Sequence, residues 1–283
     1  MKTEATFSNY EMRVRYFYIA VIVILFFHFF SNVLFSELGT PALVNPSIDN
    51  FYWLFQYVGL HKLFTQSVFL PAIGDISIAI LTLLCVFSTS YRAIWTVSFT
   101  LLFGIYCITF NTFSGHHYHG LMGILFLSVT FWFKPGLRFE LLWEAARYYF
   151  LFLFSSAAFW KICRGSIFEE NQFSNILKSQ HAQYLYQHTT SYQSSIYQYL
   201  ISHASISHWV LIGAVVLQLC FFVGFFTKKY DHTLFLLALF FSVLNFFIMG
   251  IFSFELIVMG MTLLDFENIP FLKLKKEPVI LTN

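Results

Sequence analysis

Lys161 is the residue whose type and position most suggest chemistry. It follows Phe159-Trp160 near the end of an apolar run over which we predict a membrane-spanning helix, residues 141–162. A charged side chain deep in a span costs about 2.5–3.5 kcal/mol on insertion scales, so such a lysine is a functional candidate by default. In an apolar setting its free amine can act as a base. The alternative is that this long side chain, so close to the helix end, reaches out to water.

A second candidate site is the histidine-rich segment Ser114-Gly115-His116-His117-Tyr118-His119-Gly120. Three imidazoles within four residues can serve as hydrogen-bonding groups, as acids and bases, or as metal ligands. The sequence has no second histidine box of the kind that membrane di-iron enzymes use, so we expect no metal here. The alternatives that stay open are a hydrogen-bonding or acid–base role for one of these histidines and a purely structural role.

Two carboxylates are expected at a similar depth, because each lies about one turn into a predicted span. Asp75 follows the start of the span 71–87, and Glu255 follows the start of the span 251–264. A carboxylate close to the lysine or to the histidines would neutralise them or tune their protonation. Gln218, deeper in an apolar run, is expected to join helices by hydrogen bonds. The predicted substrate-contacting residues are His116, His119, Asp75, Glu255 and Trp160.

The composition defines the class of protein that must position these side chains. Of the 283 residues, 58% are hydrophobic, 22% aromatic and only 11% charged, whereas soluble domains carry about 25% charged residues. Such a chain cannot cover itself with polar surface, so the lipid bilayer must be the solvent for much of it. The net charge is +2 and no Arg/Lys-rich tract occurs, so nucleic acid is not an expected partner.

We predict an all-α bundle of about eight membrane spans that forms a single transmembrane domain over residues 1–283. The predicted spans are 16–35, 71–87, 93–113, 120–133, 141–162, 209–226, 233–250 and 251–264. With the N-terminus in the cytoplasm, most basic residues fall on the cytoplasmic side, as the positive-inside rule requires. An even number of spans also places the C-terminal lysines there. Seven spans remain the alternative, because only Met249-Gly250 divides the last two.

Two long connections, 36–70 and 163–208, then lie on the extracytoplasmic side of a plasma or inner membrane. Both carry apolar residues three and four apart with tyrosines among them, which is typical of amphipathic helices lying in the membrane interface. These helices either cap the bundle or roof a cavity in it. Their aromatic surface is also a candidate docking site for a protein partner.

The two candidate sites together resemble the vitamin K-dependent γ-glutamyl carboxylase and the bacterial membrane proteins that share its transmembrane domain. The family reads Asn-His followed by aromatics at the first site and Phe-x-Ala-Gly-x-x-Lys at the second. The matching segments are His116-His117-Tyr118-His119 and Ser155-Ser156-Ala157-Ala158-Phe159-Trp160-Lys161, with Leu38-Gly39 and Pro41 in the first outer loop. The family's glycine before the lysine is replaced, and its large lumenal domain has no counterpart in these residues. The resemblance therefore implies the membrane fold more directly than it implies carboxylation of a bound peptide.

The resemblance implies that Lys161 is the base that deprotonates a reduced quinone, and that His117 stands beside it. The expected function is then an enzyme that acts on or binds a quinone-like or lipid-soluble molecule at the outer leaflet. No other cofactor is suggested by the sequence. The alternative is a non-catalytic membrane subunit, or a partner in the maturation of a peptide or toxin, that docks another protein through the aromatic loops. A transporter is less favoured, because no inverted repeat or pair of broken helices is evident.

Overall fold

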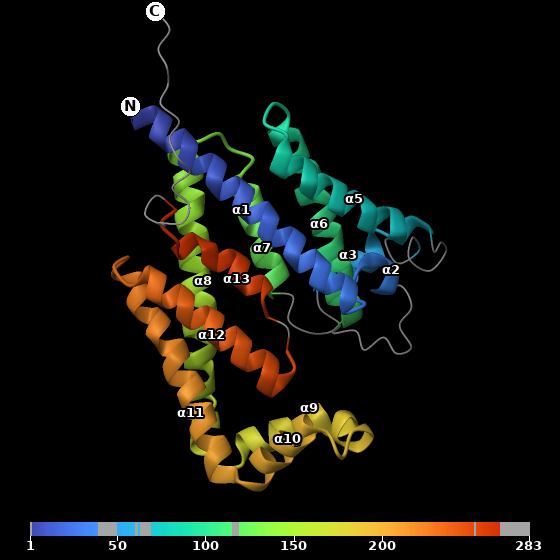
Figure 1. Ribbon diagram of the computed structural model, residues 1–283, viewed down its shortest axis with the longest axis vertical. Coiled ribbons are helices and arrows are strands. Elements are labelled where there is room, and N and C mark those ends of the chain that lie inside the picture. The colour runs from blue at the N-terminus through green and yellow to red at the C-terminus, as the bar shows by residue number, and fades with distance from the viewer. Residues whose placement is uncertain are drawn as a thin grey trace, which may run out of the picture. The chain divides into compact units, whose positions relative to one another are not determined.

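The computed structural model describes residues 2–38, 50–59, 62, 69–114, 119–251 and 253–266, and these residues form helices with no strand among them (Figure 1). The all-α class predicted from the sequence is confirmed. The chain divides into two compact units, each of which is described by itself. One unit runs to Glu144 and takes in the residues from Leu264 on, and the other is Ala145–Leu263.

The first unit contains the helices from the N-terminal part of the chain. They are α1 Lys2–Phe30, α2 Phe35–Leu38, α3 Asn50–Tyr57, α5 Phe69–Phe87, α6 Arg92–Ser114 and α7 His119–Thr130. Helix α8, Leu137–Cys163, begins in this unit and continues into the second. The second unit adds η1 Ser166–Phe168, α9 Gln172–Gln187, α10 Tyr192–Ser202, α11 Ala204–Cys220, η2 Phe221–Phe225, α12 Asp231–Met249, α13 Glu255–Gly260 and η3 Met261–Leu263.

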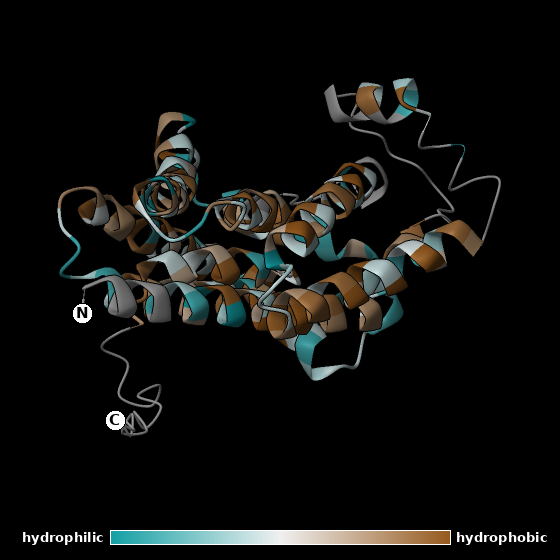
Figure 2. Ribbon diagram, turned by 90° about the horizontal axis from the view of Figure 1, so that it is seen from above, coloured by the Kyte–Doolittle hydropathy of each residue, from teal (hydrophilic) through white to brown (hydrophobic). Residues whose placement is uncertain are grey.

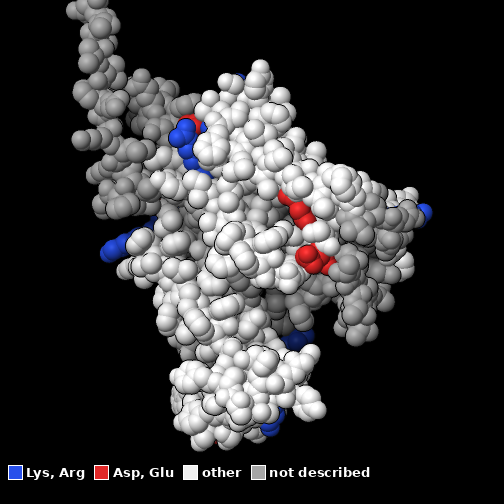
Figure 3. All heavy atoms as spheres, turned by 45° about the vertical axis from the view of Figure 1, so that its right-hand side comes forward, with Lys and Arg blue, Asp and Glu red and all other residues white. Residues whose placement is uncertain are grey.

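Five helical stretches among the described residues are long and apolar enough to cross a bilayer. They are Asn9–Leu38, Phe69–Phe87, Arg92–Asn111, Ala204–Phe225 and Asp231–Met249. Only 17% to 39% of the residues in the most apolar part of each stretch are buried. The remaining apolar side chains need another apolar phase. The helices are predominantly hydrophobic along their length (Figure 2), and few charged side chains reach the face drawn in Figure 3. An integral membrane protein is the class that these helices define.

Three predicted spans differ from these five helical stretches. The span 120–133 corresponds to α7, whose 12 residues extend about 18 Å, short of the roughly 30 Å of hydrocarbon. The span 141–162 lies in α8, which is long enough at 27 residues but carries charged side chains along its length, namely Arg138, Glu140, Glu144, Arg147 and Lys161. In the described part of the span 251–264, the helical residues are the six of α13 and the three of η3. Helix α12 ends before the left-handed Gly250 (φ 64°), and α13 begins at Glu255. These short elements do not form a spanning helix by themselves.

The core of the first unit is a cluster of aromatic rings. The Phe131 ring lies 5.1 Å from that of Phe17 and 6.1 Å from that of Tyr18, and Tyr18 meets Phe99 edge-on at 5.3 Å. All four rings are buried. Aromatic pairs at these separations add to the stabilisation that burial provides, so they fix α1 against α6 and the end of α7.

The core of the second unit joins α8 to η2 and α12. The Phe154 and Phe221 rings stack at 4.2 Å, and Leu234 and Met259 pack into the same buried cluster. In the same unit, the buried Arg147 donates two hydrogen bonds to the carboxylate of Asp231 at 2.7 and 2.6 Å. A third bond, 2.8 Å, reaches the carbonyl of Gly224. This packing holds the second half of α8, and with it Lys161, in a defined position.

Candidate functional site

The side chain of Lys161 is directed at helix α11. It lies two residues before the end of α8, and its Nζ donates a hydrogen bond of 2.7 Å to Oε1 of Gln218. Gln218 is buried, with 5% of its surface exposed, and Lys161 itself is half-buried. The amine therefore does not simply extend into solvent, which was the alternative that the sequence left open.

The electrostatic setting of this amine is unusual for a lysine. Among the described residues no carboxylate forms an ion pair with Lys161, and its hydrogen-bond partner Gln218 is a neutral amide. An amide oxygen can accept a hydrogen bond but supplies no compensating charge. A free amine held in this way keeps a lone pair that can take a proton, which is the property that a base requires.

At this end of α8, one side of the helix packs against the protein and another side is exposed. Ala158, one turn before Lys161, is fully buried, so the inner side of the helix is closely packed here. Trp160, by contrast, is 59% exposed, and the guanidinium of Arg164 lies 4.5 Å from its ring centroid. A tryptophan that carries a cation on its face suits the polar boundary of a membrane. Trp160 thus lies on the exposed side of the helix, beside the amine in sequence but turned outward.

The structure describes only part of the histidine-rich segment. His116 and His117 lie outside the described residues. His119 opens α7, and its side chain also lies outside them. A juxtaposition of His117 with Lys161 therefore stays a prediction.

Both predicted carboxylates are located by the structure. Glu255 is the first residue of α13 and is buried in the second unit. Asp75, in the first unit, accepts hydrogen bonds from the backbone N–H of Phe35 at 2.8 Å and of Ser36 at 3.0 Å, and from the Ser36 hydroxyl at 2.6 Å. It thus caps the first turn of α2, because these N–H groups have no partner within the helix. Within the second unit, the structure records no ion pair between Glu255 and Lys161.

Gln218 is the member of the site that the sequence analysis assigned to helix packing and not to the chemistry of Lys161. Its position in an apolar run predicted a hydrogen bond between helices, and the structure shows such a bond. The partner, however, is the candidate base itself. A polar side chain within a membrane span is costly unless it has a partner. The cost of an unpartnered polar side chain in a span was the sequence signal for this contact. It applied to both Gln218 and Lys161.

A second group of polar side chains closes the C-terminal end of α12. The final carbonyl groups of a helix have no partner inside it. Here the Phe246 carbonyl accepts from the N–H of Gly250, and the next three carbonyls accept from side chains of α9 and α10. Tyr197 donates to residue 247 at 3.4 Å, His181 to residue 248 at 3.2 Å and Gln180 to residue 249 at 2.7 Å. Helices α9 and α10 are thereby fixed to the end of α12.

The docking of α9 on α12 is expected to weaken as the pH falls, because His181 is only 7% exposed and stacks on Tyr197 at 3.9 Å. Burial lowers the pKa of His181 below its ordinary value, and the Ile248 carbonyl offsets this in part. Above about pH 6.5 the imidazole is neutral whether or not α9 is docked, so the docking is at full strength. Below that pH the undocked histidine takes up a proton that the docked one resists. Stability is then lost down to the lowered pKa, by about 1.4 kcal/mol for each unit between the two pKa values.

Amide hydrogen exchange of α9 and α10 between pH 8 and pH 5 measures this effect. After correction for the intrinsic rate, protection is expected to fall over that range in the unaltered chain and to stay constant in His181→Gln, whose amide can still donate to the carbonyl. His203→Gln is the matched control, because His203 is exposed. The same pH dependence in His181→Gln as in the unaltered chain would show that His181 does not cause it.

The chain was compared with known proteins at the levels of family, sequence and structure. No family model, no curated protein and no solved structure matches it. The class is therefore defined by the fold: a helical membrane protein with a lysine–glutamine pair joining α8 to α11.

Proposed function

We propose that this protein is a membrane enzyme in which Lys161 is a general base for a quinone-like or other lipid-soluble substrate. The observation that carries the proposal is the setting of the amine: half-buried, hydrogen-bonded to the buried amide of Gln218, and without an ion-pair partner among the described residues. Intramembrane amines are costly, so a lysine whose charge no carboxylate compensates is better explained by use than by stability.

In this proposal Lys161 takes the proton of a substrate hydroxyl. The substrate O–H bond breaks, the proton forms an N–H bond on Nζ, and the substrate keeps the electron pair as an oxyanion. Gln218 positions the amine, and its oxygen accepts a hydrogen bond from the ammonium that forms. A well-placed general base contributes about 10²- to 10⁴-fold to a rate. Glu255 remains the candidate to assist and Trp160 the candidate substrate contact, both in the unit that holds Lys161. Roles for His117, His116, His119 and Asp75 at this site stay predictions from the sequence.

The proposed topology places this chemistry at the outer leaflet. With the N-terminus in the cytoplasm, the five predicted spans up to residue 162 put the Lys161 end of α8 on the extracytoplasmic side, together with α9 and α10. The likeness to the transmembrane domain of the γ-glutamyl carboxylase supports the same assignment, since there a lysine deprotonates a reduced quinone. The five helical stretches that can span a bilayer are compatible with a substrate that arrives from the lipid phase.

Removing the amine of Lys161 is expected to abolish deprotonation of a bound hydroquinone and to weaken its binding about tenfold, the equivalent of about 1.4 kcal/mol. The probe is a photoactivatable naphthohydroquinone with an isoprenoid chain, added without oxygen to the full chain in nanodiscs. Deprotonation is read from the absorbance of the bound probe, and the contact site from the cross-linked peptide. Lys161→Met and Gln218→Leu are the test variants. Lys178→Met is the matched control, since Lys178 is exposed on α9.

Cross-linking to the end of α8 that is lost in Lys161→Met and kept in Lys178→Met would support the proposal. Equal labelling and equal deprotonation in all variants would remove it. Gln218→Leu distinguishes a residue that positions the amine from one that binds the substrate. Loss of a positioning residue should change the extent of deprotonation more than the extent of labelling.

A second candidate function, docking of a protein partner, is favoured by one observation. Tyr186 and Tyr192, which flank the connection between α9 and α10, are 86% and 84% exposed. Large exposed rings of this kind mark interaction surfaces. Co-purification of a stoichiometric partner that is lost when both tyrosines are changed to serine would support this function. Retention of that partner in the Tyr→Ser variant would argue against this surface.

A further inference from the structure

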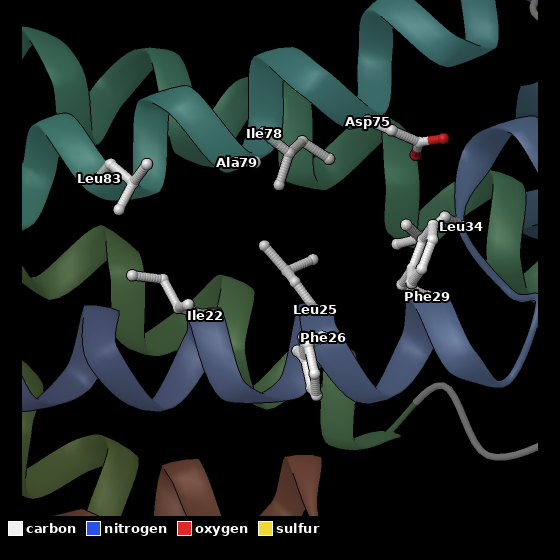
Figure 4. A pocket seen from close by; sticks show the side chains of 9 residues that line it. All are labelled: Ile22, Leu25, Phe26, Phe29, Leu34, Asp75, Ile78, Ala79 and Leu83. Atoms are coloured by element: carbon white, nitrogen blue, oxygen red, sulfur yellow. The ribbon is translucent and has the colours of Figure 1, made fainter.

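Helices α1 and α5 enclose a pocket of about 280 Å³ in the first unit (Figure 4). Ile22 and Leu25 of α1 face Ile78 and Leu83 of α5 across it, and Asp75 is the one charged side chain among the described residues that line it. The volume is near the lower end of the range for small-molecule sites, about 300–1,000 Å³. A pocket with this lining selects a hydrocarbon group over most of its length and a polar group at one end.

The pocket is elongated along the two helices. Asp75 and Leu83 are eight residues apart on α5, which corresponds to about 12 Å. Phe26 and Phe29 also line it, and both are mostly exposed, at 60% and 61%. Because both walls belong to helices that can span a bilayer, the side that these rings flank adjoins lipid. The geometry fits a single extended chain that enters sideways from the bilayer.

The polar end of the pocket lies close to a membrane face. Asp75 is six residues, about 9 Å, from the start of α5, whereas Leu83 is about 21 Å from it. On the other wall, Phe29 is next to the end of α1, and Ile22 lies deeper. Both helices therefore place the polar end at the shallower position. A bound amphiphile would lie parallel to the lipids of one leaflet, with its head at Asp75, whichever face of the membrane this is.

The hydrogen bonds that the Asp75 carboxylate already accepts determine which head group of a ligand can bind beside it. A carboxylate offers about four acceptor positions, and three are used by the first turn of α2. One position on Oδ1 is left for a donor from the ligand. A phosphate or carboxylate head would be repelled by the charge of Asp75, whereas a hydroxyl can donate to it.

We propose that this pocket binds a neutral membrane lipid that carries a hydroxyl head, with its hydrocarbon chain between α1 and α5 and its hydroxyl donating to Asp75. The site belongs to the first unit and does not depend on the role of Lys161. A long-chain alcohol is the minimal ligand of this class.

The experiment uses a diazirine-bearing hexadecanol and the full chain in nanodiscs, with cross-linked peptides identified by mass spectrometry. Labelling is expected on 22–29 and 75–83, and unlabelled hexadecanol is expected to reduce it at least fivefold at tenfold excess. Palmitate, which has the same chain length and a carboxylate head, should leave it unchanged at the same excess and at a pH where it is ionised. Labelling spread evenly over all the lipid-facing helices, or equal competition by ionised palmitate, would overturn the proposal.

Ala79→Phe tests the pocket itself, because Ala79 lines it and a phenyl ring there fills the space. Labelling of both segments is expected to fall at least fivefold. Ile80→Phe is the matched control: it adds a ring on the exposed side of the same helix, outside the pocket, and should label as the unaltered chain does. Helix content by circular dichroism establishes that both variants are folded. Equal labelling of the two folded variants would contradict the site.

Discussion

Replacing Arg147 with methionine is expected to destabilise the second unit by about 3–5 kcal/mol, the usual cost of removing one member of a buried ion pair. Arg147 is 1% exposed, and its guanidinium binds both carboxylate oxygens of Asp231 and the carbonyl of Gly224. Methionine is close in volume, so the loss comes from a carboxylate left uncompensated in an apolar core and from an orphaned carbonyl.

The measurement is equilibrium unfolding in mixed detergent micelles, followed by circular dichroism. Asp231→Leu should cost a similar amount, and the double variant Arg147→Met/Asp231→Leu should cost less than either single change, because no buried charge is then left alone. Arg164→Met is the control, since this exposed arginine should contribute less than about 1 kcal/mol. Losses that simply add in the double variant would show that the two groups do not interact.

The Arg147–Asp231 pair shows why a sequence predicts helices more readily than it predicts which charged residues pair with one another. The sequence places Arg147 three residues after Glu144, which predicts an ion pair along one helix face. The structure adds a bidentate partner 84 residues further on, Asp231, which the local sequence does not indicate. Hydropathy and charge depend on the local sequence, and they gave the long apolar helices correctly. Which charged group meets which depends on how the helices pack, and a single sequence does not contain that information in local form.

The C-terminal region illustrates a different limit. An apolar run over 251–264 predicts a span when only composition is considered. The chain instead forms two short helical segments whose residues Met259 and Leu263 enter the buried core around Phe150. Apolar residues suit a protein core as well as they suit lipid, so composition alone does not distinguish the two. Gly250, where the left-handed backbone ends α12, was the local signal of a break.

Only part of the candidate site was predicted, because the polarity of a single residue is visible in the sequence and its contact with a distant residue is not. A lysine near the end of an apolar helix is conspicuous in any sequence, because its cost in the membrane is independent of its neighbours. Its partner Gln218 is conspicuous only for its polarity, and it lies 57 positions further along the chain with no sign in the sequence that the two meet. Asp75 was recognised as a carboxylate at the right depth, yet its role as a cap for α2 depends on a four-residue helix that the sequence did not predict.

Gly224→Ala is expected to destabilise the second unit by about 1–3 kcal/mol, which is typical of an overpacked core. A methyl group at this position would lie 2.6 and 2.9 Å from the two terminal carbons of Leu151 and 3.0 Å from Leu234. Leu151 and Leu234 are themselves buried in the same cluster, so they have little room to move. Shifting the backbone instead would disturb the carbonyl of Gly224, which accepts a hydrogen bond from Arg147.

Gly213→Ala is the matched control, because it makes the same chemical change in the same unit where no atom lies within 4 Å of the added carbon. Gly213 is inside α11, so alanine there should stabilise the chain by up to about 1 kcal/mol through its higher helix propensity. The two substitutions are thus expected to move the unfolding transition in opposite directions. Since both remove a glycine from the unfolded chain, that common contribution cancels in the comparison. A stabilising Gly224→Ala would mean that Leu151 can yield, and that the contact between η2 and α8 is looser than its geometry indicates.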